Sequence, residues 1–304
     1  MEQRTLGQLA ISVVGIGCNN FGGRIDEAQT AAVVDAAIDA GINFFDTADV
    51  YGNGLSEEFL GRALGSRRDQ VVIATKFGAA TGAKPDNVRS SCEASLRRLG
   101  TDVIDLYQLH RPDDDTPIDD TLAALHELVE QGKVREIGCS NFDGARIDAA
   151  DDVSSSKGIS RFVSVQNQLS LLDRRQEDDL LAACARHGLG ILPYFPLASG
   201  MLTGKYKRGE APPEGTRLSQ MPEDRQQRAL DERNFDVVER LEQFATERGH
   251  TILELAMSWL ACLPNMASVI AGATKPEQVR SNASAVGWKL TEEEMTEVDR
   301  LARR

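Results

Sequence analysis

Short apolar runs alternate with amphipathic segments along the whole chain. The runs are rich in Val, Ile, Leu and Phe, which is typical of buried parallel strands. We expect core strands over residues 13–17, 42–46, 70–78, 102–110, 133–141, 162–168, 189–197 and 266–274. Before them, RTLG and LAISVV flank Gly7-Gln8 and predict a small β-hairpin at the N-terminus.

Helix boundary signals fill the intervals between these runs. Asp26 precedes an Ala-rich segment that stops at Gly41, and Pro85 opens a helix that ends before Gly100. Residues 116–119 (TPID) predict the cap of the next helix. Further helices are expected over 56–64, up to Arg186, from Lys275-Pro276 onward, and after a cap at Thr291.

Strands and helices that alternate in this way form a parallel sheet with right-handed crossovers. Eight strand–helix units predict an α/β fold, a single (β/α)8 TIM barrel domain over residues 1–304, with the N-terminal hairpin and one extra C-terminal helix. The alternative, an open doubly wound sheet, usually carries strand–GxGxxG–helix near its start. Here Gly15-Ile16-Gly17 is followed by CNNFGG, which is a poor match, so the barrel is favoured.

Residues 205–233 interrupt the alternation. The segment is rich in charged residues and proline, and it follows the seventh strand, so we expect it at the mouth of the barrel. A long connection inside a compact domain is usually functional or mobile. We interpret it as a flap over an active site or a bound cofactor, and a solvated insertion is the alternative.

The composition limits the classes of function. A formal net charge of −13 without a cluster of Lys and Arg argues against binding to nucleic acid or to an anionic membrane. Five cysteines without a CxxC motif indicate reduced thiols in the cytoplasm rather than disulfides or a zinc site. The N-terminus lacks the pattern of a signal peptide, and no apolar run is long enough to span a membrane.

Polar side chains occur where the predicted strands end. They are Asp46 with Tyr51 shortly after it, Lys76, His110, Ser140-Asn141 and Gln166-Asn167. Each one alone has an ordinary explanation as a turn residue, a cap or a solvated charge. Because the carboxyl ends of the strands of a β/α barrel surround one opening, together they predict an active site there.

A tyrosine, a lysine and a carboxylate at one opening suggest a proton donor. A phenol titrates near pH ~10 and is a poor acid at neutrality. A Lys76 ammonium within ~4–6 Å, held in place by Asp46, is expected to lower the pKa of Tyr51. Tyr51 can then donate a proton to an oxygen that gains negative charge, while His110 orients the same oxygen. The reduction of a carbonyl creates such an oxygen.

Seven segments, spread in order over nearly the whole chain, resemble the motifs of the aldo-keto reductases. They are GINFFDTADVYGNGLSEEFLG, ATKFG, LYQLHRPD, REIGCSNF, VQNQLSLLDR, ILPYFPLASGMLTGKY and VIAGATKPEQVRSNASA. The resemblance implies a barrel that binds NADPH in an extended form and reduces aldehydes or ketones to alcohols. The catalytic tetrad of the family falls on Asp46, Tyr51, Lys76 and His110, with Tyr51 as the proton donor.

The resemblance also implies a set of cofactor residues. Ser140, Asn141 and Gln166 match the residues that hold the nicotinamide carboxamide, and Tyr194 matches the ring that stacks on the nicotinamide. The pyrophosphate is expected along Leu197, Ser199, Gly200, Leu202 and Lys205. The adenosine and its 2′-phosphate are expected along Gly272, Ala273, Thr274, Lys275, Gln278 and Asn282.

The last group departs from many members of the family. These carry an arginine at the position of Gln278, and some carry an acidic residue at the position of Ser281, whereas Gln278 together with Gly272 resembles a bacterial-type pattern. Lys275, helped by Arg280, can still meet a phosphate. NADPH rather than NADH is therefore the predicted cofactor.

Two other functions compete with a reductase of small carbonyl compounds. Some relatives of this fold pair with channel proteins and turn over slowly, so a nicotinamide-nucleotide-binding regulatory subunit is one alternative. No partner-binding extension is visible in the sequence, so no obligate protein partner is expected. A metal-assisted hydrolase is the other alternative. His110 is the only histidine at a predicted strand end and there is no HExxH, so no metal site is expected.

Overall fold

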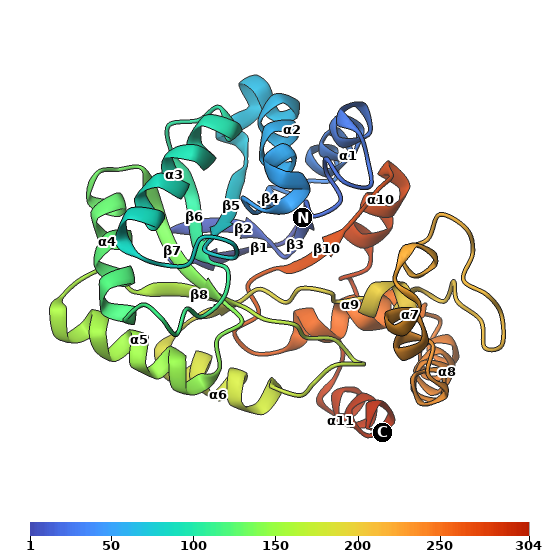
Figure 1. Cartoon of the computed structure of the whole chain (residues 1–304). Coiled ribbons are helices and arrows are strands. Elements are labelled where there is room, and N and C mark those ends of the chain that lie inside the picture. The colour runs from blue at the N-terminus through green and yellow to red at the C-terminus, as the bar shows by residue number, and fades with distance from the viewer. Residues whose placement is uncertain (304) are drawn as a thin grey trace.

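The computed structural model describes residues 1–303, and a curled parallel sheet lies at its centre (Figure 1). Within these residues the sheet has eight strands, β3 to β10, which are Val14–Gly17, Phe44–Asp46, Val72–Phe77, Ile104–Leu109, Val134–Ser140, Phe162–Gln166, Gly190–Ile191 and Val269–Gly272. Their spatial order is β10-β3-β4-β5-β6-β7-β8-β9, and each pairing is parallel. A parallel bridge between Ile191 and Met266 joins the two edges of the sheet. The predicted (β/α)8 barrel is confirmed.

The N-terminal hairpin, also predicted, packs against the starts of the strands. β1 (Gln3–Leu6) pairs antiparallel with β2 (Leu9–Ser12), and the backbone N–H of Gln8 donates to Glu136 Oε1 at 2.7 Å. A Cβ on Gly190, the first residue of β9, would lie 2.3 Å from the Leu6 side chain, so glycine is needed where the hairpin meets the barrel. Because the hairpin covers this end, the barrel is open at the end where the strands finish.

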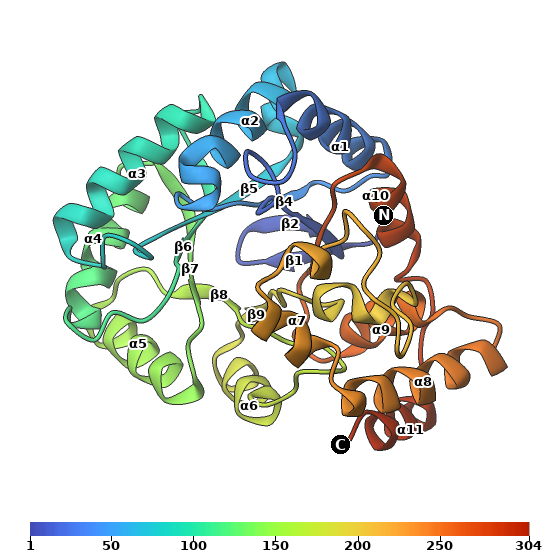
Figure 2. The same cartoon turned by 45° about the vertical axis from the view of Figure 1, so that its right-hand side comes forward.

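Helices surround the sheet, as Figure 2 shows for α1 to α6. Their bounds are α1 Glu27–Asp39, α2 Leu55–Leu64, α3 Pro85–Leu99, α4 Ile118–Glu130, α5 Gly144–Lys157, α6 Glu177–His187, α7 Glu223–Ala229, α8 Glu232–Glu247, α9 Ile252–Cys262, α10 Pro276–Ser284 and α11 Glu292–Ala302. Asp26 forms a capping box with Gln29, and Thr291 forms one with Glu294, as the sequence predicted for both helix starts.

Three local features differ from the sequence-based expectations. Thr116 does not cap α4; its hydroxyl donates to Asp113 Oδ2 at 2.8 Å, and Pro117 occupies the cap position. β9 is shorter than the predicted strand because Pro193, which has no N–H, follows it closely. The connection from β9 to β10 contains α7, α8 and α9, none of which the sequence analysis identified, and neither did it identify α5.

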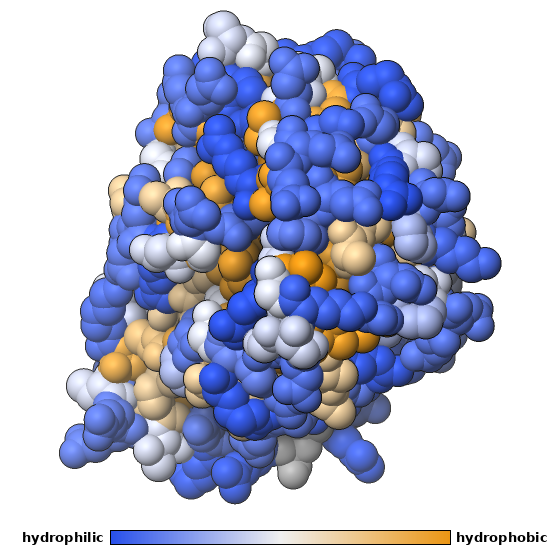
Figure 3. Space-filling view, turned by 90° about the vertical axis from the view of Figure 1, so that its left-hand side faces the viewer, coloured by the Kyte–Doolittle hydropathy of each residue, from blue (hydrophilic) through white to orange (hydrophobic). Residues whose placement is uncertain are grey.

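The outer surface is mainly hydrophilic on the face shown in Figure 3, with hydrophobic residues visible only in small patches. Scattered patches of this kind are normal on a folded protein. Among the helices of residues 1–303, none combines the length and the apolar character needed to cross a lipid bilayer.

Candidate active site

A pocket of about 870 Å³ opens at the carboxyl ends of the strands. Its lining includes Asp46, Tyr51 and His110 of the predicted tetrad, and Lys76 is buried in contact with Asp46. All of the predicted cofactor residues except Leu202 also line this pocket. Residues from most of the chain therefore meet in one cavity at the end of the barrel where β/α barrels carry their chemistry.

A buried ion pair forms one wall of the site. Lys76 Nζ, from β5, donates to Asp46 Oδ2 of the neighbouring β4 at 2.7 Å and to the carbonyl oxygen of Thr47 at 2.8 Å. The second oxygen of Asp46 accepts from the amides of Gln108 at 3.2 Å and Gln166 at 2.8 Å. Burial opposes the charge on Lys76, but Asp46 and Tyr51 outweigh it and raise the pKa of the ammonium above its usual value.

A tight turn between β4 and α2 presents Tyr51. The turn is a 3-10 helix over Tyr51–Gly54, in which Gly52 adopts a left-handed φ of 56°. A Cβ on Gly52 would lie 3.0 Å from the carbonyl oxygen of Phe21, so the close approach of the two loops requires glycine. The Lys76 ammonium lies 5.1 Å from the centre of the Tyr51 ring. The turn thus holds the phenol next to the buried charge.

The pKa of Tyr51 is raised above its usual value of 10, chiefly because the phenol is buried. Lys76 acts in the opposite direction, as the sequence led us to expect, but its effect is smaller than that of burial, and Asp46 partly offsets it. The expected net lowering was therefore wrong, because desolvation penalises the phenolate more than the ammonium stabilises it. Tyr51 is protonated at neutral pH, which is the state that a proton donor requires.

His110 follows β6 and faces Tyr51. The two rings meet edge to face with their centroids 5.9 Å apart. Burial, together with the charges of Lys76 and Arg111, lowers the pKa of His110 from 6.5 to about 3, so the imidazole is neutral at pH 7. Its Nδ1 is buried without a hydrogen-bond partner among the described residues. A neutral imidazole of this kind can donate one N–H to a substrate oxygen.

The low pKa of His110 predicts a loss of stability in mild acid. A histidine in the unfolded chain takes up a proton near pH 6.5, whereas folded His110 resists protonation down to about pH 3. This residue should therefore lower the free energy of unfolding by up to about 1.4 kcal/mol for each pH unit of acidification within that range. Urea unfolding at a series of pH values measures the effect, with His110→Asn as a control that cannot titrate. Parallel profiles for the two proteins would contradict the prediction.

The four predicted nicotinamide residues form one hydrogen-bonded group. Ser140 Oγ donates to the carbonyl oxygen of Gln166 at 2.7 Å, and Tyr194 donates its hydroxyl to Asn141 Oδ1 at 2.7 Å. Asn141 Nδ2 in turn donates to Ser140 Oγ at 3.1 Å and to the carbonyl oxygen of His110 at 2.9 Å. These bonds fix the side chains to one another and to His110 before any ligand binds.

The connection after β9 brings Leu197, Ser199, Gly200 and Lys205 to the pocket. Lys205 packs over Gly200, where a Cβ would lie 2.7 Å from the lysine Nζ. Leu202, by contrast, is fully buried in the hydrophobic core, and its backbone N–H donates to the carbonyl oxygen of Leu197 at 3.3 Å. The structure therefore does not bring Leu202 to the pocket; this side chain packs beneath the turn that presents its neighbours.

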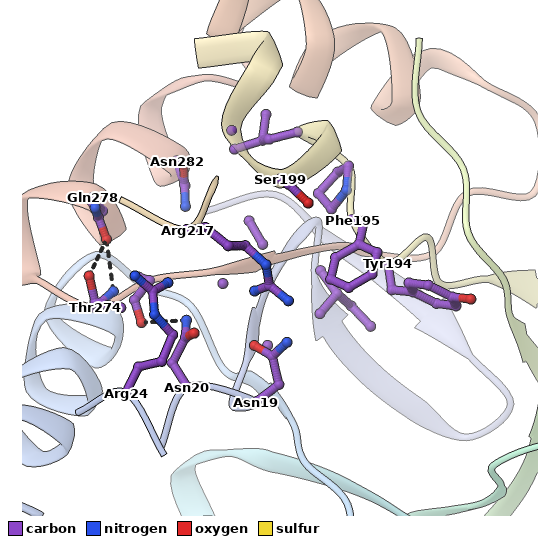
Figure 4. A pocket seen from close by; sticks show the side chains of 18 of the residues that line it. Asn19, Asn20, Arg24, Tyr194, Phe195, Ser199, Arg217, Thr274, Gln278 and Asn282 are labelled. Atoms are coloured by element: carbon purple, nitrogen blue, oxygen red, sulfur yellow. Dashed lines mark hydrogen bonds between the residues drawn. The ribbon is translucent and has the colours of Figure 1, made fainter. Parts of the chain in front are cut away.

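The segment from β10 into α10 supplies another wall, formed by Gly272, Ala273, Thr274, Lys275, Gln278 and Asn282. Gln278 Oε1 accepts from the backbone N–H of Thr274 at 2.7 Å and from its hydroxyl at 3.2 Å (Figure 4). Gln278 therefore stabilises the turn before α10. The exposed Lys275 and the N-terminus of α10, which has no side-chain cap, make this wall favourable for a phosphate.

The pocket also contains polar residues that the sequence analysis did not single out. Asn19 and Asn20 follow β3, and Oδ1 of Asn20 is buried without a partner among the described residues. Arg217 reaches from the 205–233 segment into the middle of the pocket, with its Cζ 4.8 Å from the centre of the Phe195 ring, and Arg24 lies nearby (Figure 4). The clustering of polar residues at strand ends could have identified Asn19 and Asn20, whereas no sequence signal marks Arg217.

The lining fits an extended anionic ligand. Arg24, Lys205, Arg217 and Lys275 line the pocket without forming an ion pair within residues 1–303. Arg217 Nε is buried and unpaired, and burial, together with the charge of Arg24, lowers the pKa of this guanidinium. Phosphates placed here would supply the missing counter-charges. Across residues 1–303 no group of three or more His, Cys, Asp or Glu side chains is placed to hold a metal ion.

Comparison with known proteins identifies the family. The profile of the Aldo/keto reductase family matches residues 13–303. Two proteins named "Probable voltage-gated potassium channel subunit beta", from Oryza sativa subsp. japonica and Arabidopsis thaliana, are each 33% identical over 299 residues, which cover 94% of this chain and 91% of theirs. "Probable aldo-keto reductase 1" from Glycine max is 35% identical over 301 residues, which cover 95% of this chain and 84% of its own. The chain therefore belongs to the aldo/keto reductase family of NAD(P)H-dependent carbonyl oxidoreductases.

Proposed function

We propose that the protein reduces aldehydes or ketones to alcohols with NADPH and that Tyr51 is the proton donor. The observation that carries this proposal is the placement of Tyr51 between two groups: the ammonium of Lys76, paired with Asp46, lies 5.1 Å from its ring centre, and the His110 ring faces it edge to face at 5.9 Å. When bound, NADPH supplies the hydride. The proton and the stabilisation of the developing negative charge come from side chains of this protein.

Tyr51 and His110 act on the carbonyl oxygen of the substrate. The Tyr51 hydroxyl donates to this oxygen and gives up its proton as negative charge develops there. The Lys76 ammonium stabilises the resulting phenolate, while Asp46 keeps Lys76 charged and in place. His110 donates an N–H to the same oxygen and orients the carbonyl. Because these groups are already in position, they need little reorganisation when negative charge develops on the substrate oxygen.

The cofactor residues are proposed to hold NADPH in an extended form. Ser140, Asn141 and Gln166 suit the carboxamide of the nicotinamide, because Asn141 bonds to His110 and Gln166 bonds to Asp46 of the tetrad, while the ring of Tyr194 suits stacking on the nicotinamide. Lys205 suits the pyrophosphate. To the sequence-based set we add Arg217, because its buried unpaired Nε lies in the middle of the pocket.

A preference for NADPH over NADH rests on the wall near α10. Lys275 is exposed there and forms no ion pair within the described part of the chain, so an additional phosphate finds a cation and a helix N-terminus. The bacterial-type pattern of Gly272 and Gln278 stays a prediction, because the relatives named above are plant proteins. Tighter binding of NADH than of NADPH would overturn the preference.

Residues 1–304 are proposed to work as one barrel domain, with 205–233 as a flap over the cofactor. In support, Arg24 Nε donates to Gln220 Oε1 at 2.8 Å and its terminal nitrogen donates to the carbonyl oxygen of Gly215 at 3.1 Å. These two bonds connect the segment to the loop after β3. Closure of such a flap would keep phosphates of the cofactor in contact with Arg217.

A second candidate is a nucleotide-binding regulatory subunit with little turnover. Two relatives carry the name of a potassium channel β subunit, so a protein partner of that kind is a specific alternative. The complete set of Asp46, Tyr51, Lys76 and His110 at one opening favours turnover instead. We therefore retain a small carbonyl compound as the proposed substrate, without an obligate protein partner, a metal or a nucleic acid, and the cytoplasm as the proposed location.

Binding and turnover of NADPH test the two candidates together. NADPH should quench the intrinsic fluorescence of the protein and should then be oxidised when a reactive aldehyde is added. Quenching without oxidation across a panel of aldehydes and ketones would favour the regulatory subunit. Turnover that depends on an added divalent cation would overturn the proposed chemistry, because the proposed acid is Tyr51 rather than a metal-bound water.

A further inference from the structure

We propose that Arg111 selects carbonyl substrates that carry a carboxylate or a phosphate away from the reacting carbonyl. This inference rests on the proposed reductase function and adds the substrate class. Arg111 lines the pocket directly after His110, and its side chain is exposed. It is therefore one residue away from the group proposed to orient the carbonyl oxygen.

The charge of Arg111 is not neutralised by the protein. Arg111 forms no hydrogen bond or ion pair within residues 1–303. Two of the three acidic residues that follow it are engaged elsewhere: Asp113 accepts from the backbone N–H of Ala83 and the hydroxyl of Thr116, and Asp114 pairs with Arg146 at 3.0 Å. The third, Asp115, forms no ion pair with Arg111 and does not line the pocket. An unpaired guanidinium in a pocket is a site for a planar anion, because its N–H groups match a carboxylate or phosphate.

The position of Arg111 in the barrel separates it from the cations proposed for the cofactor. Arg111 follows β6, and in the closed order β10-β3-β4-β5-β6-β7-β8-β9 this strand lies four places from β10 in either direction. Lys205, Arg217 and Lys275 all belong to the connections that follow β9 and β10. A cofactor whose phosphates contact those residues therefore leaves the β6 side of the mouth to the substrate.

The remaining charges of the pocket support this division. Asp46 is paired with Lys76, and Glu214 belongs to the 205–233 segment, next to Gly215, which Arg24 holds. No carboxylate among the described lining residues thus competes for Arg111. Because the protein as a whole carries a formal charge of −13, an anionic substrate needs a local cation to be retained. Arg111 supplies that cation beside the reacting group.

The test compares pairs of substrates in which one member carries an anionic group and the other is neutral. For the carboxylate arm, 4-carboxybenzaldehyde is compared with its neutral methyl ester, methyl 4-formylbenzoate. For the phosphate arm, glyceraldehyde 3-phosphate is compared with glyceraldehyde. We expect the parent enzyme to favour the anionic member of at least one pair by roughly 10–100-fold in kcat/KM, with most of the difference in KM. The arm that shows the preference identifies which anion the site accepts.

Two variants assign the preference to Arg111. Arg111→Gln should reduce the ratio of the two kcat/KM values to near one, and Arg111→Lys should retain part of it, because the charge remains but the bidentate geometry is lost. Arg111 also lowers the pKa of His110, and a role through His110 alone would change the kcat/KM of both members of a pair equally and leave their ratio intact.

An unchanged ratio in Arg111→Gln, or no anionic preference in a parent that reduces the neutral compounds, overturns this inference and leaves the reductase function standing. A parent that oxidises no NADPH with any of the four compounds overturns the reductase function itself, and this inference with it.

Discussion

Tyr51→Phe is expected to lower kcat for aldehyde reduction by roughly 10²–10⁴-fold, the usual contribution of a positioned general acid. The phenylalanine ring keeps the contact with the Lys76 ammonium, which lies 5.1 Å from the ring centre in the parent, but it has no proton to give. The dissociation constant of NADPH should change little, because the phosphates and the adenosine are held by other parts of the pocket. Steady-state kinetics and a fluorescence titration with NADPH measure the two quantities.

Tyr107→Phe provides a matched control for this experiment. The Tyr107 hydroxyl is buried in the same barrel, has no hydrogen-bond partner within residues 1–303 and does not line the pocket. Its removal takes away the same atom without touching the proposed acid, so kcat should stay close to that of the parent. A Tyr51→Phe enzyme as active as Tyr107→Phe would show that the proton comes from another group.

The fold was predictable because its signals are local. α3 begins at Pro85 and ends at Leu99 before Gly100, as proposed from the preference for proline at the start of helices and glycine after their ends. The gathering of the tetrad was predictable for a different reason. Once eight strand–helix units indicate a closed barrel, topology places every strand end at the same opening, so Asp46 and His110 converge although they are distant in sequence.

What the sequence did not reveal depends on the packing between distant segments. Arg217 lies in a charged, proline-rich stretch where nothing distinguishes it from its neighbours, and only the folded connection brings it over Phe195. The direction of the pKa shift of Tyr51 was mistaken because the sequence shows the presence of Lys76 but not the degree of burial of the phenol. Leu202 was assigned to the cofactor by its place in a motif, whereas its side chain belongs to the core.

Asp46→Asn is expected to cost about 3–5 kcal/mol of the free energy of unfolding and to remove most of the activity, because it leaves a buried ammonium without a counter-charge. Lys76 is 1% exposed in the parent, and its other acceptor is the carbonyl oxygen of Thr47. Without Asp46, burial is no longer outweighed by that carboxylate, and the pKa of Lys76 should fall below its usual value of 10.5. The charge that stabilises the phenolate of Tyr51 is then weakened as well.

The pH dependence of stability distinguishes this effect from a simple loss of packing. In the parent, the pKa of Lys76 is raised, so its contribution to stability is complete below pH 10.5 and is lost only as the pH rises through the pKa of the folded state. In Asp46→Asn the pH dependence of the Lys76 contribution reverses, because the unfolded chain keeps a proton that the folded state tends to release. The loss of stability relative to the parent should therefore shrink as the pH rises from 7 towards about 9.

The double variant Asp46→Asn/Lys76→Met should recover much of the stability without the activity, since both charges are then replaced by neutral groups. Urea unfolding of the parent, Asp46→Asn and the double variant at pH 7 and about pH 9 measures these differences in the free energy of unfolding. A loss of stability that is the same at both pH values and persists in the double variant would exclude the ion pair as its source.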